Sequence, residues 1–132
     1  MTTPNTTPAT PVKPPLRTLF CIGVNQNFFD STQAEMKDVW TAFVQMMQGI
    51  GALPGVHVLG NMDDDRSMVG PSDTSPWTTY VLADCPDLET VHAACNLFRT
   101  IGVGDGTYKL WKYCKVEARV GRELSIPAYA AA

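Results

Sequence analysis

The pattern of hydrophobic and polar positions along the chain predicts four strands and two helices. Short segments rich in β-branched and aromatic residues are typical of strands, whereas apolar residues that recur every three or four positions are typical of helices. The strand segments are Arg17–Val24, Val56–Met62, Trp77–Ala83 and Leu110–Val120. The first segment is apolar at both parities, which predicts that both of its faces are covered. The last alternates regularly, with Trp111 and Tyr113 on its outward face.

The first predicted helix follows a turn-rich stretch, NQNFFDST, whose last residues Asp30, Ser31 and Thr32 are candidate N-caps. Glu35 stands three residues after Thr32, so these two residues complete a capping-box pattern. One wide apolar stripe then follows, made of Met36, Val39, Trp40, Phe43, Val44, Met47 and Ile50. The stop signals after it are Gly49, Gly51 and Pro54.

The second predicted helix begins after Asp84 or Asp87, either of which is a suitable N-cap, and it ends at Gly102. Its apolar stripe is made of Leu88, Val91, Cys95, Phe98 and Ile101. A polar stretch, MDDDRSMVGPSDTSP, predicts a long hairpin connection before the third strand, and Gly60 predicts a bulge in the second.

The resulting order, β-α-β-β-α-β, predicts an α+β protein of the ferredoxin-like arrangement, with two helices on one face of an antiparallel sheet. Large residues at both parities of the first and third strands would leave an apolar patch on the other face of a monomer. We therefore expect a homodimer in which two sheets pack face to face, a dimeric α+β barrel. A twisted monomer with a partly wet face is the alternative.

Composition fits one globular domain, because the 132 residues are 45% hydrophobic and 17% charged, with a net charge of -3. Five of the ten prolines fall in the first fifteen residues, so residues 1–15 are predicted to be a disordered tail. The domain is predicted over residues 16–124, and residues 125–132 are predicted to form a second tail. Four cysteines without a CxxC pair favour free, buried thiols over disulfides.

Charge and hydropathy narrow the range of partners. The chain has neither the apolar core of a signal peptide nor an apolar run of about 18 residues, so we expect a cytoplasmic protein without a membrane partner. Eleven acidic residues against three basic ones between Asp30 and Asp105 argue against nucleic acid. The basic segment from Lys109 to Ala132 is either a solvated face or a surface that steers a small anion such as a carboxylate.

Several motifs that can mark a binding site are not expected to do so at their positions in this sequence. Gly102, Gly104 and Gly106 spell GxGxG, but they follow a helix and precede a strand, the reverse of a dinucleotide-binding turn. The acidic run Asp63–Asp65 lacks the spacing of a calcium loop and is predicted to be a solvated turn. His57 and His92 form no pair at metal-ligand spacing, so no metal site and no other tightly bound cofactor is expected.

His92 is the candidate catalytic base, because it lies at the edge of the stripe that should face the sheet. The alternative interpretation is that His92 is a hydrogen-bonded histidine at the boundary of the core. His57 is a second candidate with the same alternative, and its position is less suited to reaching a ligand. Cys95, three residues after His92, is the one thiol with a histidine at helical spacing. Trp40 and Tyr80 are candidates to shape a pocket for a flat aromatic molecule, although core or dimer packing explains them equally well.

The chain resembles the dimeric α+β barrel superfamily, which includes cofactor-free monooxygenases, lactone isomerases and haem-degrading enzymes. More specifically, RTLFCIGVNQNFFD, MQGIGALPGVHVLGNMDDD, PWTTYVLAD, ACNLFRT and LWKYCKVEARVGR resemble the IacB-type family, which is encoded with enzymes of indole-3-acetate catabolism. The superfamily resemblance implies a ligand pocket between sheet and helices, lined by Trp40, Phe43, Met47, His92 and Cys95. Haem would need a histidine ligand, for which only His92 is available.

Two hypotheses follow. In the first, the protein binds an oxidised aromatic acid of the indole-3-acetate type and transforms it by proton abstraction, isomerisation or oxygen insertion, with His92 as base. In the second, it is a non-catalytic dimer that sequesters such an intermediate or docks onto a partner oxygenase.

Overall fold

The computed structural model describes residues 13–66, 69–70 and 75–130, and it is built around one four-stranded antiparallel sheet. The α+β class is confirmed. Along the sheet the strands follow the order β2-β3-β1-β6, so the first strand in sequence lies in the interior and the second lies at an edge. These strands are β1 (Leu16–Val24), β2 (His57–Asp63), β3 (Thr79–Cys85) and β6 (Cys114–Gly121).

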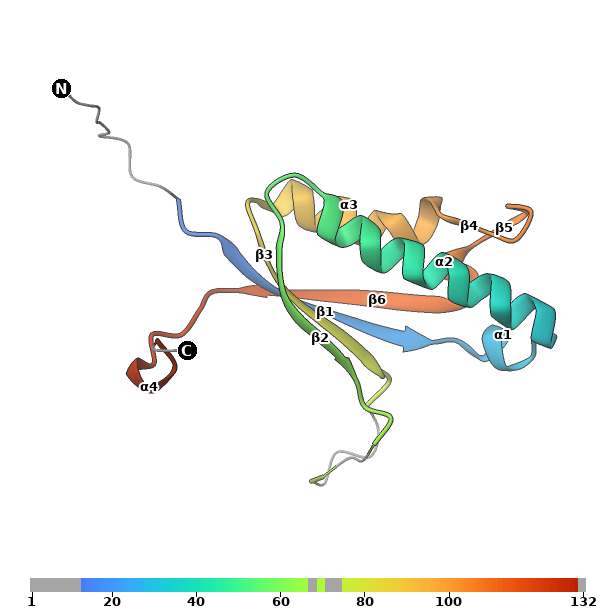
Figure 1. Ribbon diagram of the computed structural model, residues 1–132, viewed down its shortest axis with the longest axis horizontal. Coiled ribbons are helices and arrows are strands. Elements are labelled where there is room, and N and C mark those ends of the chain that lie inside the picture. The colour runs from blue at the N-terminus through green and yellow to red at the C-terminus, as the bar shows by residue number, and fades with distance from the viewer. Residues whose placement is uncertain (1–12, 67–68, 71–74, 131–132) are drawn as a thin grey trace.

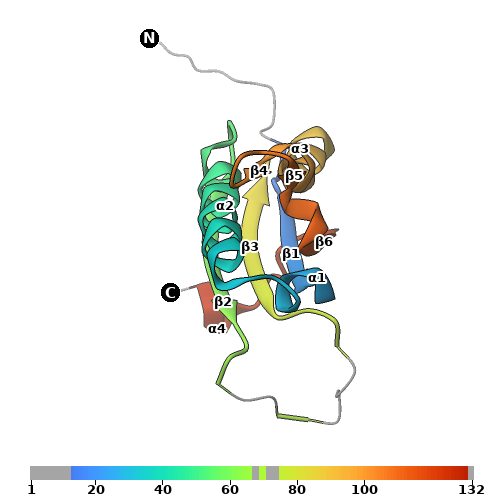
Figure 2. The ribbon, with the colours of Figure 1, turned by 90° about the vertical axis from the view of Figure 1, so that its right-hand side faces the viewer.

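Two long helices, α2 (Gln33–Ala52) and α3 (Leu88–Thr100), lie on the same face of this sheet. Figure 2 shows that α2 runs on the side of β2 and β3, whereas α3 lies on the side of β1 and β6. The shorter elements are α1 (Gln26–Phe29), β4 (Gly102–Val103), β5 (Tyr108–Lys109), the 3-10 helix η1 (Leu110–Lys112) and α4 (Pro127–Ala130).

Both long helices begin where the sequence predicts. The Thr32 hydroxyl accepts a hydrogen bond from the Glu35 backbone N–H at 3.2 Å, and the Glu35 carboxylate accepts one from the Thr32 N–H at 3.3 Å. Asp87, rather than Asp84, caps α3 by accepting the Thr90 N–H at 2.8 Å. The capping box is therefore confirmed, and it fixes the start of the helix that borders the site described below.

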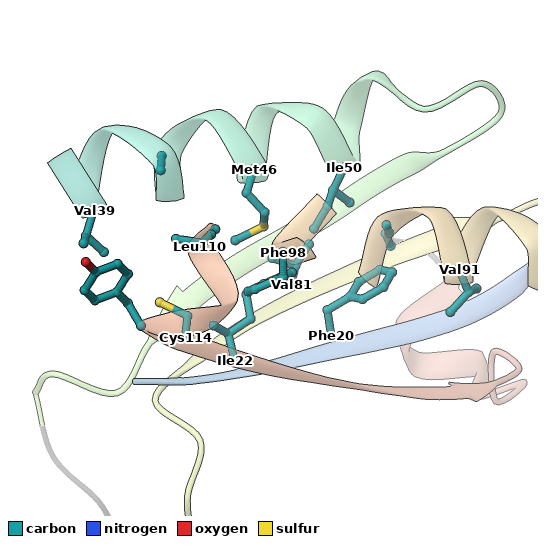
Figure 3. Packing of buried hydrophobic residues seen from close by; sticks show 14 of the residues in the cluster. Phe20, Ile22, Val39, Met46, Ile50, Val81, Val91, Phe98, Leu110 and Cys114 are labelled. Atoms are coloured by element: carbon teal, nitrogen blue, oxygen red, sulfur yellow. The ribbon is translucent and has the colours of Figure 1, made fainter. Parts of the chain in front are cut away.

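The core lies between the two helices and the interior strands. Figure 3 shows Met46 and Ile50 pointing from α2 toward the sheet, where Phe98 of α3 and Phe20 of β1 meet them. All four side chains are almost completely buried. Because burying such side chains removes about 25 cal/mol of unfavourable free energy per Å² of apolar surface, this cluster supplies the main stabilisation of the fold.

The edge strand β2 contrasts with this core, since every one of its residues is exposed. Its neighbour β3 alternates between buried and half-buried positions. The pairing of β2 with β3 shifts register between Val58 and Gly60, which confirms the bulge predicted at Gly60. The helix layer therefore covers the interior strands closely and leaves the β2 edge open.

The prediction of a strand over Leu110–Val120 is wrong for its first residues. Leu110 to Lys112 form the 3-10 helix η1, and the strand itself starts at Cys114. Tyr113, predicted to face outward, is buried, because the turn of η1 rotates its side chain into the core. The GxGxG stretch is part of a helix-to-strand connection as predicted, with Gly104 and Gly106 in the left-handed region that glycine favours.

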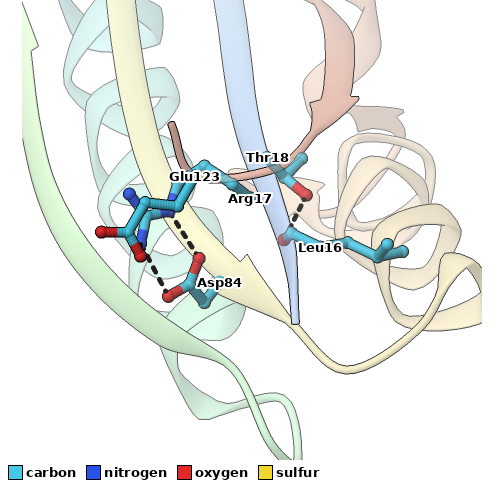
Figure 4. A network of polar contacts seen from close by, with 5 residues as sticks. All are labelled: Leu16, Arg17, Thr18, Asp84 and Glu123. Atoms are coloured by element: carbon cyan, nitrogen blue, oxygen red, sulfur yellow. Dashed lines mark hydrogen bonds and ion pairs between the residues drawn. The ribbon is translucent and has the colours of Figure 1, made fainter. Parts of the chain in front are cut away.

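The sheet face opposite the helices is bounded by ion pairs. Arg17 donates to Asp84 through Nε at 2.6 Å and through a terminal nitrogen at 3.2 Å, and it also reaches Glu123 at 3.5 Å (Figure 4). The hydrogen bond to Asp84 raises the pKa of Arg17. Leu19 and Leu82, which are paired across β1 and β3, are only half-buried on this face.

Both predicted tails have little packing in their described parts. Residues 1–12 lie outside the described residues, and Lys13 to Pro15 are exposed. Residues 121–129 are also exposed, including Pro127 to Tyr129 of α4. All four cysteines are free, as predicted: Cys21, Cys85 and Cys114 are buried, and Cys95 is half-buried.

Candidate functional site

A hollow of about 440 Å³ lies between the middle of α2 and the sheet. It opens at the end of the sheet where β1 and β2 finish and where β3 and β6 begin, and Phe28 of α1 borders this end. The volume is in the range of pockets that hold small organic ligands. The residues that line it are Ile22, Val24, Phe28, Val39, Trp40, Phe43, Val44, Met47, Gln48, Asn61, Met62, Asp63, Thr79 and Cys114. We call this space the first hollow.

Most of the wall of the first hollow is apolar, and α2 supplies its aromatic part. The rings of Trp40 and Phe43 stack with their centroids 5.5 Å apart and an interplanar angle of 18°. Trp40 remains 63% exposed, although it belongs to the predicted apolar stripe. A large apolar ring at the rim of an apolar hollow, with no protein atoms covering its outer part, is available to a flat ligand.

The polar groups of the first hollow lie together at the open edge of the sheet. Asn61 and Asp63 project from β2, where their register partners on β3 are Val81 and Thr79. The Asp63 carboxylate also accepts the backbone N–H of Asp65 at 3.2 Å, which fixes its orientation. Among the described residues, no Lys, Arg or His lines this hollow. Its polar end therefore offers hydrogen-bond acceptors and negative charge rather than a cation.

A second hollow, of about 450 Å³, lies between α3 and the beginning of β6. Its residues are His92, Cys95, Asn96, Phe98, Arg99, Trp111, Cys114, Lys115 and Val116. The Arg99 guanidinium lies 4.8 Å from the centroid of the Trp111 ring, a cation–π contact. Cys114 lines both hollows, so the two spaces lie on either side of this buried thiol.

The structure brings together only part of the predicted site. Trp40, Phe43 and Met47 line the first hollow, whereas His92 and Cys95 line the second. The five residues are divided between two hollows, one beside α2 and the other beside α3.

The other two predicted residues lie in neither hollow. The register places Tyr80 opposite Cys21 on the sheet face away from the helices, and its hydroxyl donates to the Trp77 carbonyl at 3.3 Å. His57 is exposed at the start of β2, opposite Asp84. Neither residue contributes to the wall of the first hollow.

The cysteine–histidine pair is poorly suited to nucleophilic chemistry. Burial raises the pKa of the Cys95 thiol, so its thiolate is disfavoured at neutral pH. A catalytic thiol needs the opposite shift, which a neighbouring cation or a helix N-terminus provides. Cys95 is therefore best described as a half-buried structural thiol in the wall of the second hollow.

Sequence reasoning missed the polar end of the first hollow. The acidic run that contains Asp63 predicts a solvated turn, and no motif marks Asn61 or Thr79, although all three residues line the hollow. A signal was present, because Asn61 and Asp63 are two residues apart at the end of a strand and therefore share one face. Only the structure places that face under α2.

Among the described residues, no group of three or more His, Cys, Asp or Glu side chains is arranged to hold a metal ion. Within the same part of the chain, no helix combines the length and apolar character needed to cross a membrane. The chain matches no protein-family model, and no curated protein or solved structure is significantly similar to it. Function is therefore inferred from the hollows themselves.

Proposed function

We propose that the protein binds a small, flat aromatic molecule of the indole class in the first hollow. The observation that carries this proposal is the apolar space of about 440 Å³ bordered by the stacked Trp40 and Phe43 rings. Stacking on a fixed aromatic ring provides a large contact area at a small cost in conformational entropy. Met47 and Val44 extend the apolar wall along α2, which suits a fused two-ring system.

The polar end of the hollow favours a ring that carries an N–H donor. Asp63 and the amide oxygen of Asn61 both accept hydrogen bonds, and an indole N–H is a donor without acceptor capacity. An ionised carboxylate on the ligand would be repelled by Asp63, so the side chain of an indole acid points toward the open mouth. The proposed ligand therefore enters ring first.

The proposed role is in aromatic catabolism of the indole-3-acetate type, as a protein that holds an oxidised aromatic intermediate. His92, the expected base, does not line the first hollow. This observation favours the second hypothesis, in which the chain is a non-catalytic binding module that serves a partner oxygenase. Transformation of the ligand is a separate outcome that the experiment below distinguishes.

We also propose that the strand order corresponds to the ferredoxin-like arrangement and that a second copy covers the open sheet face. Leu19 and Leu82 form an apolar centre on that face. Charges of both signs surround it, including the Arg119–Glu117 pair at 2.7 Å. A surface with an apolar centre and both signs of charge is complementary to itself across a two-fold axis.

Binding is tested by titrating the protein with indole and with 1-methylindole, which has the same rings but no N–H. Indole should bind more tightly, and calorimetry should give a difference of about tenfold, because a hydrogen bond to a charged acceptor contributes about 1.5 kcal/mol. Asp63→Ala should remove this preference. Asp65→Ala, which changes a neighbouring exposed acid outside the lining, should keep it.

Equal affinity of wild-type protein for the two ligands, or no binding of either, would contradict the proposal. Incubation with oxidised indole-3-acetate derivatives, followed by product analysis between about pH 5 and 9, separates binding from turnover. Unchanged recovery supports the binding module, whereas a product would restore the enzymatic hypothesis.

The dimer is tested by analytical ultracentrifugation. Wild-type protein should sediment as a dimer, and Leu82→Asp should convert it to a folded monomer by placing a charge in the apolar centre of the open face. Leu88→Asp is the matched control, because Leu88 is 55% exposed at the start of α3 on the helix side. A wild-type monomer would refute the dimer without affecting the ligand proposal.

A further inference from the structure

The second hollow has a different chemistry from the first, and the proposed function does not use it. Its floor is apolar, because Phe98 and Cys114 are almost completely buried and Val116 is half-buried. Its margin is polar and carries Arg99 together with the Asn96 amide. An apolar floor with a cationic margin is suited to a small molecule that has an apolar body and an anionic end.

The formally charged residues that line this hollow are Arg99 and Lys115, both of them basic. Among the described residues of its wall there is no Asp or Glu. This is notable in a chain whose formal net charge is -3. A concave surface bordered by one sign of charge concentrates counter-ions of the opposite sign and speeds their encounter. The second hollow is therefore a local electropositive site on an acidic protein.

Arg99 is held in place without a carboxylate partner among the described residues. The ion pairs of this part of the chain involve Arg17 and Arg119, whereas the guanidinium of Arg99 lies over the Trp111 ring. Stacking on an aromatic face leaves the edge of a guanidinium free to donate hydrogen bonds in its own plane. That edge matches the two oxygens of a carboxylate, which Arg binds in a bidentate manner.

The Lys115 side chain points away from the second hollow. Lys115 alternates along β6 with Cys114 and Val116, which pack on the core, so its side chain lies on the sheet face opposite α3. Its ammonium group lies 5.6 Å from the centroid of the Trp77 ring. Arg99 is therefore the residue that presents positive charge to a ligand in the second hollow.

We propose that the second hollow is a separate binding site for a small aromatic carboxylate. The ring lies on the floor formed by Phe98, Cys114 and Val116, and the carboxylate accepts hydrogen bonds from Arg99. This site differs from the proposed indole site in the charge it selects, because the first hollow carries Asp63 and no cation. The proposal does not depend on the indole site, since the two hollows have only Cys114 in common.

The test is an NMR titration that follows the three tryptophan indole N–H signals, assigned with single Trp→Phe variants. Benzoate should shift the Trp111 signal and leave the Trp40 signal in place, because these residues border different hollows. Benzamide supplies the ring without the charge, acetate supplies the carboxylate without the ring, and phosphate supplies an anion of another class. Each should bind at least tenfold more weakly than benzoate.

Arg99→Gln should weaken benzoate binding about tenfold, because it removes the charge of the donor while keeping a polar side chain with an N–H group. Arg122→Gln is the control, since Arg122 is exposed and lies outside the hollow. The unchanged Trp40 signal of Arg99→Gln reports that the variant is folded. A wild-type Trp111 signal that benzoate does not move would overturn the proposal, and so would equal affinity in Arg99→Gln.

The two proposals fail in distinguishable ways. Loss of the indole response at Trp40 with a retained benzoate response at Trp111 would remove the indole site alone. The reverse result would remove the carboxylate site alone. If phosphate binds at Trp111 as tightly as benzoate does, the hollow selects anions in general, and its assignment to aromatic carboxylates is wrong.

Discussion

The apolar side chains of α2 meet two different surroundings. Met46 and Ile50 are completely buried in the core and do not line the first hollow. Trp40 and Phe43 lie on the side of the helix that lines the first hollow, beside the exposed strand β2. One helix therefore serves as a structural element along one side and as the wall of a binding site along the other.

This difference shows that a wide apolar stripe on a helix can serve both core packing and the wall of a pocket. A stripe of about 100° is enough to attach a helix to a sheet, and residues beyond that width need another partner. On α2 the surplus faces a space that no described side chain fills. Substitutions on the two sides of α2 should therefore differ in their effect on stability.

The largest effect is expected at Met46, and its neighbour Met47 is the matched control. Met46 is completely buried, so Met46→Ala should lower the free energy of unfolding by about 2–5 kcal/mol through the cavity that it leaves. Met47 is half-buried in the wall of the first hollow, and Met47→Ala should cost less than about 1 kcal/mol. Urea denaturation measures both values on the same scale.

Met47→Ala should nevertheless weaken indole binding, whereas Met46→Ala should not when it is measured below its unfolding midpoint. Similar losses of stability in both variants would mean that the hollow is closed in solution. In that case the contrast between the two sides of α2 would disappear.

An intermediate effect is expected from Cys114, which separates the two hollows. Burial raises the pKa of this thiol to about 11, from an ordinary value near 9. Between these values the folded state keeps a proton that the unfolded state has lost, so stability decreases as the pH rises from 9 to 11. Two units correspond to about 2–3 kcal/mol of unfolding free energy.

Cys114→Ala removes this titration and is the variant to compare. Burial also raises the pKa of Cys85 and of Cys95, so the wild-type protein loses stability at high pH for several reasons. The measured quantity is the loss of unfolding free energy between pH 8 and 11, which should be smaller in Cys114→Ala by about 2–3 kcal/mol. Identical losses would place the thiol in contact with water through one of the hollows.

Much of the fold can be predicted from local sequence patterns. The prediction fails where packing against the core decides the structure. The capping pattern of Thr32 and Glu35 and the bulge at Gly60 are governed by neighbouring residues, so sequence reasoning finds them. The start of β6 is not, because Tyr113 alternates correctly for a strand and yet follows the 3-10 turn η1. A one-turn rotation decided by packing against the core cannot be seen in the alternation alone.

Part of the candidate site could also be predicted from a local pattern, the periodicity of the apolar residues on a helix. Periodicity assigns Trp40, Phe43 and Met47 to one helix, and the structure places them together. Periodicity cannot say which face of α3 turns toward α2, and the structure places His92 beside the second hollow. The contribution of Asp63 depends on a long-range pairing of β2 with β3, which no local signal specifies.

The smallest effect on stability, and the sharpest test of the hollow side of α2, is expected at Trp40. Because this side chain is 63% exposed, the main contribution that Trp40→Ala removes from the free energy of unfolding is the stack on Phe43, about 0.5–1.5 kcal/mol. Removing one face of the stacked pair should weaken indole binding about tenfold, since an aromatic pair contributes up to about 1.5 kcal/mol beyond its buried area.

Calorimetry and urea denaturation of the same samples measure the two quantities. Tyr129→Ala is the control, because Tyr129 is 75% exposed and lies in α4, away from the lining of either hollow. A loss of stability without a loss of affinity would make Trp40 a packing residue. The opposite result is expected for a residue of a binding surface, because the ligand then needs this large exposed ring and the fold does not.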